Sequence, residues 1–211
     1  GCKVFNSTYI VKKTVNQDDI HTYHTYYGDD TGSPGTAMTF FDFPNNPKGI
    51  KGTNAITRTS FRVPNDASLE YYQERFDKFD VKHEAITTEF GKKVLRFWDF
   101  DEQAYQLISD ENNVGMKPGK KWKKGPVPEK FAIYGLGPVE ITVSYFNDFK
   151  EIFEELLSFE EIAQEGNRYL LEVGEKGNGA QVVLIEDATQ NIAQQGYGEV
   201  HHFALRLKDA A

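Results

Sequence analysis

The sequence contains very little cysteine and no long apolar run. Cys2 is the only cysteine among the 211 residues, which excludes an internal disulfide framework and fits a reducing compartment. No window approaches the roughly 18 consecutive apolar residues of a membrane-spanning helix. We therefore expect a cytoplasmic protein without a membrane partner.

Basic residues are scarce relative to acidic ones. The chain has 24 lysine and arginine residues against 32 aspartate and glutamate residues, a formal net charge of -8. This balance argues against nucleic acid as the main partner. Hydrophobic residues make up 39% and aromatic residues 14% of the chain, which is typical of a folded protein with one large domain or two small ones.

One succession of predicted elements occurs twice along the chain. Residues 53–63 are rich in β-branched and aromatic residues, as in a strand, and residues 66–79 carry apolar side chains at helical spacing. The strands predicted after this helix are 81–89, 93–100 and 104–109. A βαβββ unit therefore spans residues 53–110.

The second occurrence spans residues 131–190. Residues 136–145 are its predicted first strand, and Asn147 and Asp148 are the predicted N-cap of a helix that runs to Leu157. The strands predicted after this helix are 160–164, 168–173 and 180–186. Such repetition at a fixed order is the pattern of a fold built from copies of one unit.

Parts of two more units flank the complete ones. The predicted strands 11–15, 23–27 and 37–42 resemble the last three strands of a first unit. Its own first strand and helix are not recognisable in residues 1–10. Residues 200–207 are predicted to be the first strand of a fourth unit, which is truncated after it. We expect the remaining parts of both units to lie outside this sequence.

These units predict an α+β fold with two domains, residues 1–110 and 131–211. The segment 111–130 is rich in proline, glycine and lysine and is interpreted as a solvated linker. Within this fold the units are expected to pair into curved, cup-shaped mixed sheets with the helices outside. Units one and four would then meet in one cup.

The histidines are the most informative polar residues. His201 and His202 open the predicted final strand, where neighbouring side chains face opposite ways. An ordinary polar histidine is the usual interpretation of such a residue. The repeat favours a metal ligand instead, because a ligand on a first strand can meet ligands of another copy across a cup. The chain shows no dinucleotide-binding, phosphate-binding or nucleophile motif.

Four segments of the sequence resemble one known family. Their residues are 11–19 (VKKTVNQDD), 23–29 (YHTYYGD), 32–36 (GSPGT) and 198–205 (GEVHHFAL). They resemble the vicinal oxygen chelate superfamily of glyoxalases, bleomycin-resistance proteins and extradiol dioxygenases, and in particular its bacterial two-domain dioxygenases that cleave hydroquinone rings. The resemblance covers nearly all of the chain.

This resemblance implies a divalent metal held by a histidine on a first strand and an acid on a last strand. Alignment of the three visible first strands places Thr57, Pro138 and His202 at the histidine position. The approximate equivalents of the acid are Thr39, Gln106 and Val183. Units two and three are therefore expected to be structural. His202 is the one predicted metal ligand, and the others are expected outside this sequence.

The function that the resemblance implies is a metal-dependent ring-cleaving dioxygenase acting on an aromatic diol or hydroquinone with O2. Fe(II) is the expected metal, because two histidines and a carboxylate are typical of non-haem Fe(II) oxygenases, and Mn or Zn are alternatives. His24 and Tyr26 share a face of their strand and are candidate substrate-binding residues, although ordinary strand packing would also explain them. No catalytic residue is assigned. A homodimer is possible.

Two other functions stay open at this point. A glyoxalase-like isomerase or lyase would use Ni or Zn and usually four protein ligands, which Thr39 disfavours. A non-catalytic protein that binds a drug or quinone in the cup is compatible with the incomplete set of metal ligands.

Alternation along residues 200–207 suggests which histidine of the pair faces the metal. His202 shares a face with Ala204 and Arg206, while His201 shares the other face with Phe203 and Leu205. The large apolar side chains should pack against the helix layer. We therefore expect His202 to face the cup.

Overall fold

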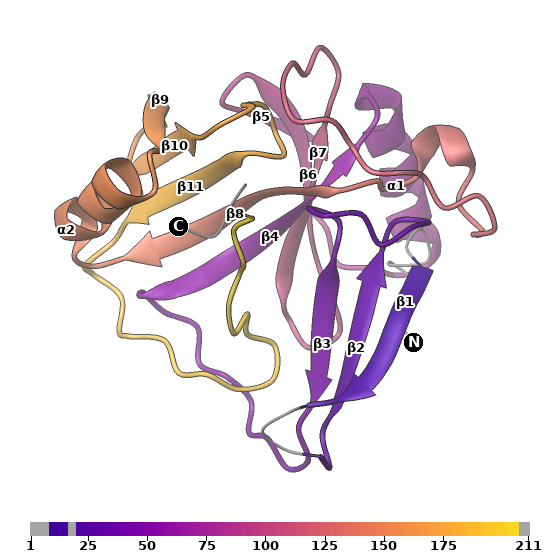
Figure 1. Cartoon of the computed structure of the whole chain (residues 1–211), viewed down its shortest axis with the longest axis horizontal. Coiled ribbons are helices and arrows are strands. Elements are labelled where there is room, and N and C mark those ends of the chain that lie inside the picture. Colours follow the sequence, from indigo (N-terminus) through magenta and orange to yellow (C-terminus); the bar gives the residue numbers. More distant parts are fainter. Residues whose placement is uncertain (1–8, 17–19, 207–211) are drawn as a thin grey trace.

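The computed structural model describes residues 9–16 and 20–206, whose strands form two sheets (Figure 1). The three-stranded sheet contains β1 (Tyr9–Val15), β2 (Tyr23–Gly28) and β3 (Met38–Asp42). The eight-stranded sheet contains β4 (Ala55–Val63), β5 (Thr87–Glu89), β6 (Lys92–Trp98), β7 (Ala104–Ser109), β8 (Leu136–Val143), β9 (Glu160–Glu165), β10 (Arg168–Glu172) and β11 (Gln181–Glu186). The helical segments are α1 (Asp66–Lys78), a 3-10 turn (Glu129–Phe131), α2 (Phe146–Glu151) and a π-helical turn (Ile152–Leu156).

The eight-stranded sheet unites the two complete units. Its strand order is β5-β6-β7-β4-β8-β11-β10-β9, and in each unit the first strand runs parallel to the last. β4 and β8 pair antiparallel in the middle, so each unit contributes one half of the sheet. The predicted α+β fold of repeated βαβββ units in mixed sheets is thereby confirmed. The sheet takes strands from both sides of residues 111–130, and the division into domains 1–110 and 131–211 stays a prediction.

Two apolar clusters lie between the sheet and its helices. In the first cluster, Leu69, Tyr72 and Phe76 of α1 are fully buried against side chains of β4, β6 and β7. In the second cluster, Phe146 and Phe153 pack on side chains of β8, β10 and β11. The helices therefore cover one face of the sheet, as expected. Side chains of the opposite face alternate with the core residues along each strand.

The two helices begin for different reasons. Asn65 caps α1, because its side chain accepts a hydrogen bond from the Ser68 N–H (3.1 Å). The predicted cap at Asn147 and Asp148 is wrong. The second helix already starts at Phe146, whose buried ring lies 4.3 Å from the ring of Tyr169, and no side chain caps it. Burial of this aromatic ring outweighs the capping preference of the two polar residues.

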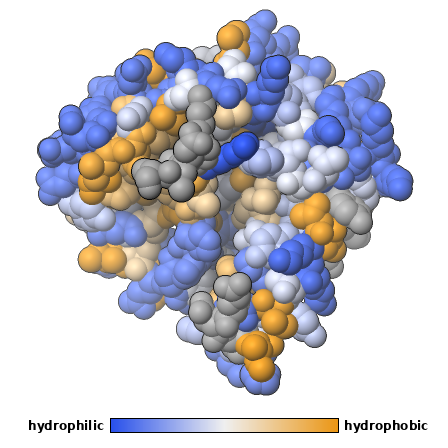
Figure 2. All heavy atoms as spheres, viewed as in Figure 1, coloured by the Kyte–Doolittle hydropathy of each residue, from blue (hydrophilic) through white to orange (hydrophobic). Residues whose placement is uncertain are grey.

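The outer side of α2 exposes apolar side chains. Figure 2 shows hydrophobic residues gathered over α2 and the π-helical turn that follows it, where Tyr145, just before α2, and Ile152 and Leu156, in the turn, are exposed. Residues four or seven apart lie on one face of a helix, so these side chains form a stripe. None of the helices in the described part of the chain is long and apolar enough to cross a membrane.

Two predicted strands differ in the structure. The strand predicted at 81–89 is reduced to residues 87–89. The segment before it meets β6 at a single isolated bridge, between His83 and Phe97, and a single bridge does not make a strand. The strand predicted at 200–207 is wrong within the described residues. Only Val200 forms a bridge, to Ile56, and residues 201–206 make no ladder. A strand requires a neighbour along its length. The final residue, 207, lies outside the described residues.

The three-stranded sheet matches the predicted strands 11–15, 23–27 and 37–42 to within a few residues. Met38 and Phe40 of β3 pack against the first apolar cluster. The loop after β2 is fixed by Asp29, whose carboxylate accepts hydrogen bonds from the N–H groups of Thr31 (3.0 Å) and Ser33 (2.8 Å). Residues 1–8, where no strand was recognisable, lie outside the described residues.

Candidate functional site

The predicted substrate-binding residues lie side by side on β2. This strand pairs with β1 on one edge and β3 on the other, so its backbone direction is fixed from both sides. The Tyr26 hydroxyl and His24 Nδ1 are 2.9 Å apart, and the two rings have centroids 4.1 Å apart. The predicted shared face is therefore confirmed, whereas the role of both residues in substrate binding stays a prediction.

Aromatic rings of β3 continue this cluster. Phe41 lies opposite His24 in the strand register, and their rings stack with centroids 4.0 Å apart. Phe43 stacks in turn on Phe41, at 5.4 Å. Our sequence analysis did not single out these two phenylalanines. Their spacing of two along the chain was the available signal, since it places both on one face of an extended segment.

The histidine pair approaches this cluster from the far end of the chain. The rings of His201 and Phe41 have centroids 6.4 Å apart. His201 and His202 are both exposed, and their Nδ1 atoms lie 2.8 Å apart. One Nδ1 must donate and the other accept, so a donating His202 would keep a lone pair on Nε2 for a metal. The three residues predicted for the site are thus gathered on one part of the molecule.

The structure does not separate the roles of the two neighbouring histidines. Phe203 is partly buried against the second apolar cluster, as expected, but Leu205 is exposed. We assigned His202 to the cup from the alternation of side chains along a strand. Residues 201–206 form no strand, so this alternation does not apply to them. The assignment of His202 to the metal and of His201 to packing stays a prediction.

The surroundings of His24 disfavour the charged form of its ring. Burial of its ring lowers the pKa of His24 below the ordinary value, and His202 and Lys12 lower it further. Nε2 of this ring is buried and has no hydrogen-bond partner among the described residues. In its neutral form, the imidazole that contacts Tyr26 through Nδ1 has one ring nitrogen left for a ligand.

The described residues do not form a complete metal centre. They contain no group of three histidine, cysteine or acidic side chains close enough to hold a metal ion. Thr39, at the predicted position of the acid, lies opposite Tyr26 in the register of β2 and β3. The cluster can supply one or two imidazole ligands to a metal, but among the described residues it does not supply the carboxylate that would complete the ligand set.

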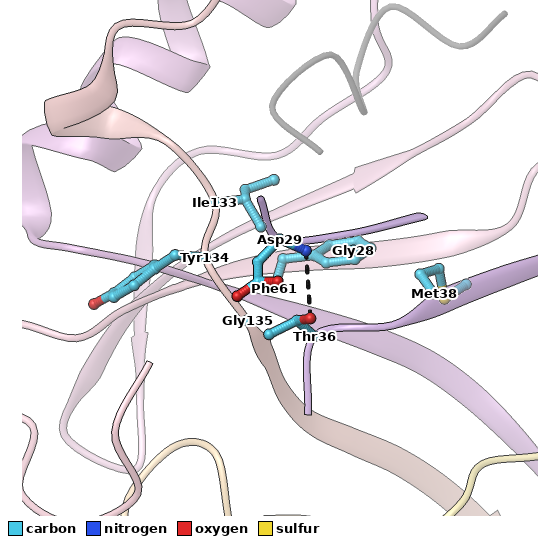
Figure 3. Close-up of a pocket in the computed structure, with 8 residues that line it drawn as sticks. All are labelled: Gly28, Asp29, Thr36, Met38, Phe61, Ile133, Tyr134 and Gly135. Atoms are coloured by element: carbon cyan, nitrogen blue, oxygen red, sulfur yellow. Dashed lines mark hydrogen bonds between the residues drawn. The ribbon is translucent and has the colours of Figure 1, made fainter. Parts of the chain in front are cut away.

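A small cavity lies behind the loop that follows β2 (Figure 3). Asp29, Thr36 and Tyr134 are among the residues around it, and its volume is about 10 Å³. The N–H of Lys120 also donates to the Asp29 carboxylate, at 2.7 Å. This cavity has room for a water molecule at most, so it is not a substrate site.

In units two and three, the carboxylate near the equivalent positions of the metal ligands is paired with arginines and is not available to a metal. Pro138, Gln106 and Val183, predicted as the equivalents of metal ligands, line one cavity on the helix-free face of the sheet. Glu140 is nearby and is 4% exposed, and it forms ion pairs with Arg58, Arg96 and Arg168. The remaining equivalent, Thr57, instead makes a 3.0 Å hydrogen bond with the Thr142 hydroxyl.

Comparison with known proteins identifies what the chain is similar to. No known family profile matches it. It is 39% identical over 205 residues to "Putative ring-cleaving dioxygenase MhqA" of Bacillus subtilis, covering 95% of this chain and 64% of the relative. It is 26% identical over 205 residues to a chlorohydroquinone/hydroquinone 1,2-dioxygenase of Sphingobium indicum, covering 95% of this chain and 63% of that protein.

Solved structures agree with these relatives. A crystal structure of a "putative dioxygenase" from Bacillus subtilis superposes with a TM-score of 0.81 at 27% identity, covering 92% of this chain and 60% of that one. A glyoxalase I variant from Zea mays superposes with a TM-score of 0.60 at 12% identity, covering 92% and 67%, and shares the fold alone. The chain spans less than two thirds of the length of the curated relatives that it matches.

Proposed function

Because the chain belongs to the vicinal oxygen chelate superfamily, we propose that it forms part of a metal-dependent dioxygenase that cleaves the ring of an aromatic diol or hydroquinone with O2. The observation that carries this proposal is the cluster in which His24 and Tyr26 of β2 lie near His201 and His202. Residues almost 180 positions apart supply an aromatic wall, the unsatisfied Nε2 of His24 and two exposed imidazoles, which suit a flat ring with hydroxyl groups.

We propose that His202 is one ligand of the metal and that the metal is Fe(II). A neutral imidazole is a common ligand of Fe(II), and also of Mn(II) and Zn(II). A bound Fe(II) would supply Lewis-acid activation of the diol oxygens and an open position for O2. The proposal requires further ligands beyond the described residues, because these contain no group of three metal-binding side chains.

His24 and Tyr26 are proposed to bind the substrate. Tyr26 fixes the orientation of the His24 ring, and stacking on Phe41 holds its plane. Nε2 of His24 can form one hydrogen bond with a hydroxyl group of the substrate, as donor or as acceptor according to the tautomer of the ring. The neutral form of this imidazole, which burial favours, avoids placing a charge beside a neutral diol.

A non-catalytic binding protein for a quinone or drug is the second candidate function. The absence of a third metal-binding side chain among the described residues favours it. In both cases the occupant is a small aromatic molecule. The single cysteine supports the cytoplasm as the proposed location, and a homodimer stays a prediction.

Oxygen uptake with methylhydroquinone, measured in the full-length protein after loading with Fe(II), tests the proposal. His202→Ala should abolish uptake and lower the iron content, while His201→Ala, the matched control, should retain both. Tyr26→Phe should raise KM several-fold with little change in kcat, because it loosens a substrate-binding imidazole. Equal losses in both histidine variants would contradict the assignment of His202. Methylhydroquinone binding without any uptake by the wild type would favour the non-catalytic function.

A further inference from the structure

A second cavity lies between units two and three, on the helix-free face of the eight-stranded sheet. Its volume is about 20 Å³, which is room for about one or two water molecules. Most of its wall is apolar and is made by Val94, Ile108, Pro138, Leu170, Val183 and Phe90. These side chains come from both halves of the sheet. The cavity therefore lies where the two halves of the sheet meet.

Two polar atoms at this cavity lack a partner among the described residues. Gln106 is 3% exposed, and its Nε2 donates to the Ser60 hydroxyl (2.9 Å) while its Oε1 has no hydrogen bond. The Nε–H of Arg168 is also buried and unpaired. An unpaired acceptor and an unpaired donor on one cavity are costly unless a ligand or water satisfies them.

The charges around the cavity balance. Glu89, which lines the cavity, forms ion pairs with Arg96 and Arg168, and Arg168, which also lines it, forms a further ion pair with Glu140. These guanidinium and carboxylate groups are therefore already neutralised by one another. An ion would gain little net attraction here, so the unpaired donor and acceptor fit a neutral ligand.

A hairpin turn closes the cavity. The tip residue Phe90 has a φ of 46°, which a bulky residue rarely adopts, and its N–H donates to Glu165 (2.7 Å). The Arg168 guanidinium lies 5.6 Å from the centre of the Phe90 ring and pairs with Glu89 (2.8 Å). These contacts join the two ends of the eight-stranded sheet. Opening of this turn would break these polar contacts and release the strain at Phe90.

We propose that this cavity is a second ligand site, for a small apolar molecule that carries one hydroxyl group, and that residues 89–91 are its lid. A hydroxyl group can donate to Gln106 Oε1 and accept from Arg168 Nε, which satisfies both atoms, while the apolar wall receives the rest of the molecule. The closed cavity is too small for such a ligand, so the lid must open to admit it. The site is independent of the proposed dioxygenase function.

Phenol and benzene are suitable probes, because they differ by one hydroxyl group. Phenol should shift the methyl NMR signals of Val94, Ile108, Leu170 and Val183, and it should bind more tightly than benzene. Gln106→Leu should weaken phenol binding about fivefold, the loss of roughly one neutral hydrogen bond, and leave benzene binding unchanged. Gln103→Leu is the matched control, since Gln103 is also buried with an unpaired Oε1 but does not line the cavity.

The lid is tested with Phe90→Gly, which removes both the ring and the strained φ. This variant should increase the association rate of phenol several-fold. The proposal is overturned if phenol at millimolar concentration leaves the four methyl signals unshifted, which would mean that the cavity holds water only. It is also overturned if Gln106→Leu and Gln103→Leu weaken phenol binding equally. Phenol shifts confined to the β2–β3 cluster would support the proposed function and refute the second site.

Discussion

Asp110→Ala should destabilise the protein strongly, because the Asp110 carboxylate satisfies three side chains at once. Arg62 Nε donates to both of its oxygens (2.9 and 3.2 Å), the Tyr134 hydroxyl donates at 2.8 Å, and Asn178 Nδ2 donates at 2.8 Å. Arg62 is on β4, Tyr134 precedes β8, and Asn178 is in the hairpin between β10 and β11. The carboxylate therefore links both halves of the eight-stranded sheet.

The size of the effect follows from burial of the pair. The Arg62 side chain is 3% exposed and that of Asp110 is 5% exposed, so removal of the carboxylate leaves a buried, uncompensated guanidinium. Breaking such a pair costs about 3–5 kcal/mol. The carbonyl of Met116, which also accepts from Arg62, cannot neutralise its charge. At about 2–4 °C per kcal/mol for a chain of this length, the melting temperature should fall by roughly 6–20 °C.

Thermal and urea unfolding, followed by circular dichroism, measure this loss. Asp148→Ala is the matched control, since Asp148 is exposed in the first turn of α2, and it should change the free energy of unfolding by no more than about 0.5 kcal/mol. Tyr134→Phe removes one hydrogen bond and should cost about 1 kcal/mol. A loss below about 1 kcal/mol for Asp110→Ala would refute the reasoning, because it would mean that Arg62 regains its solvation.

The repeated units could be predicted because their signals are local. Spacing of apolar residues predicted the helix at 66–79, and it is found at 66–78 with Leu69, Tyr72 and Phe76 buried. Strands were found near their predicted positions where the predicted segment had at least one neighbouring strand to pair with, as for the edge strands β1 and β9. Residues 200–207 were predicted as a strand from their place in the repeat, but residues 201–206 form none, because ladder formation depends on a neighbouring strand and not on the run itself.

The site was less predictable, because it depends on contacts between distant segments. Sequence alone suggested His24, Tyr26 and His202, and the structure gathers them, but Phe41 enters only through the register of β2 and β3. The polar network around Glu140 was not predicted at all. Its charged residues sit at alternating strand positions, which sequence analysis normally assigns to a solvent-facing side. Curling of the sheet buries that side instead.

The segment around Gly119 gives the last two predictions. Gly119→Ala should destabilise the protein by about 1–3 kcal/mol in urea unfolding, because an added Cβ would meet Asp29 Oδ2 and Thr36 Cγ2 at 2.6 Å, whereas Gly135→Ala has only ordinary contacts and should be nearly neutral. Burial raises the pKa of Asp29, but hydrogen bonds from Lys120, Ser33 and Thr31 outweigh it and lower the pKa below 3.8. Its stabilisation is therefore present above the ordinary carboxyl pKa and is lost as the pH falls through the lowered pKa. Unfolding titrations of Asp29→Asn should show less acid dependence in this range than the wild type, and an unchanged dependence would contradict the role of Asp29.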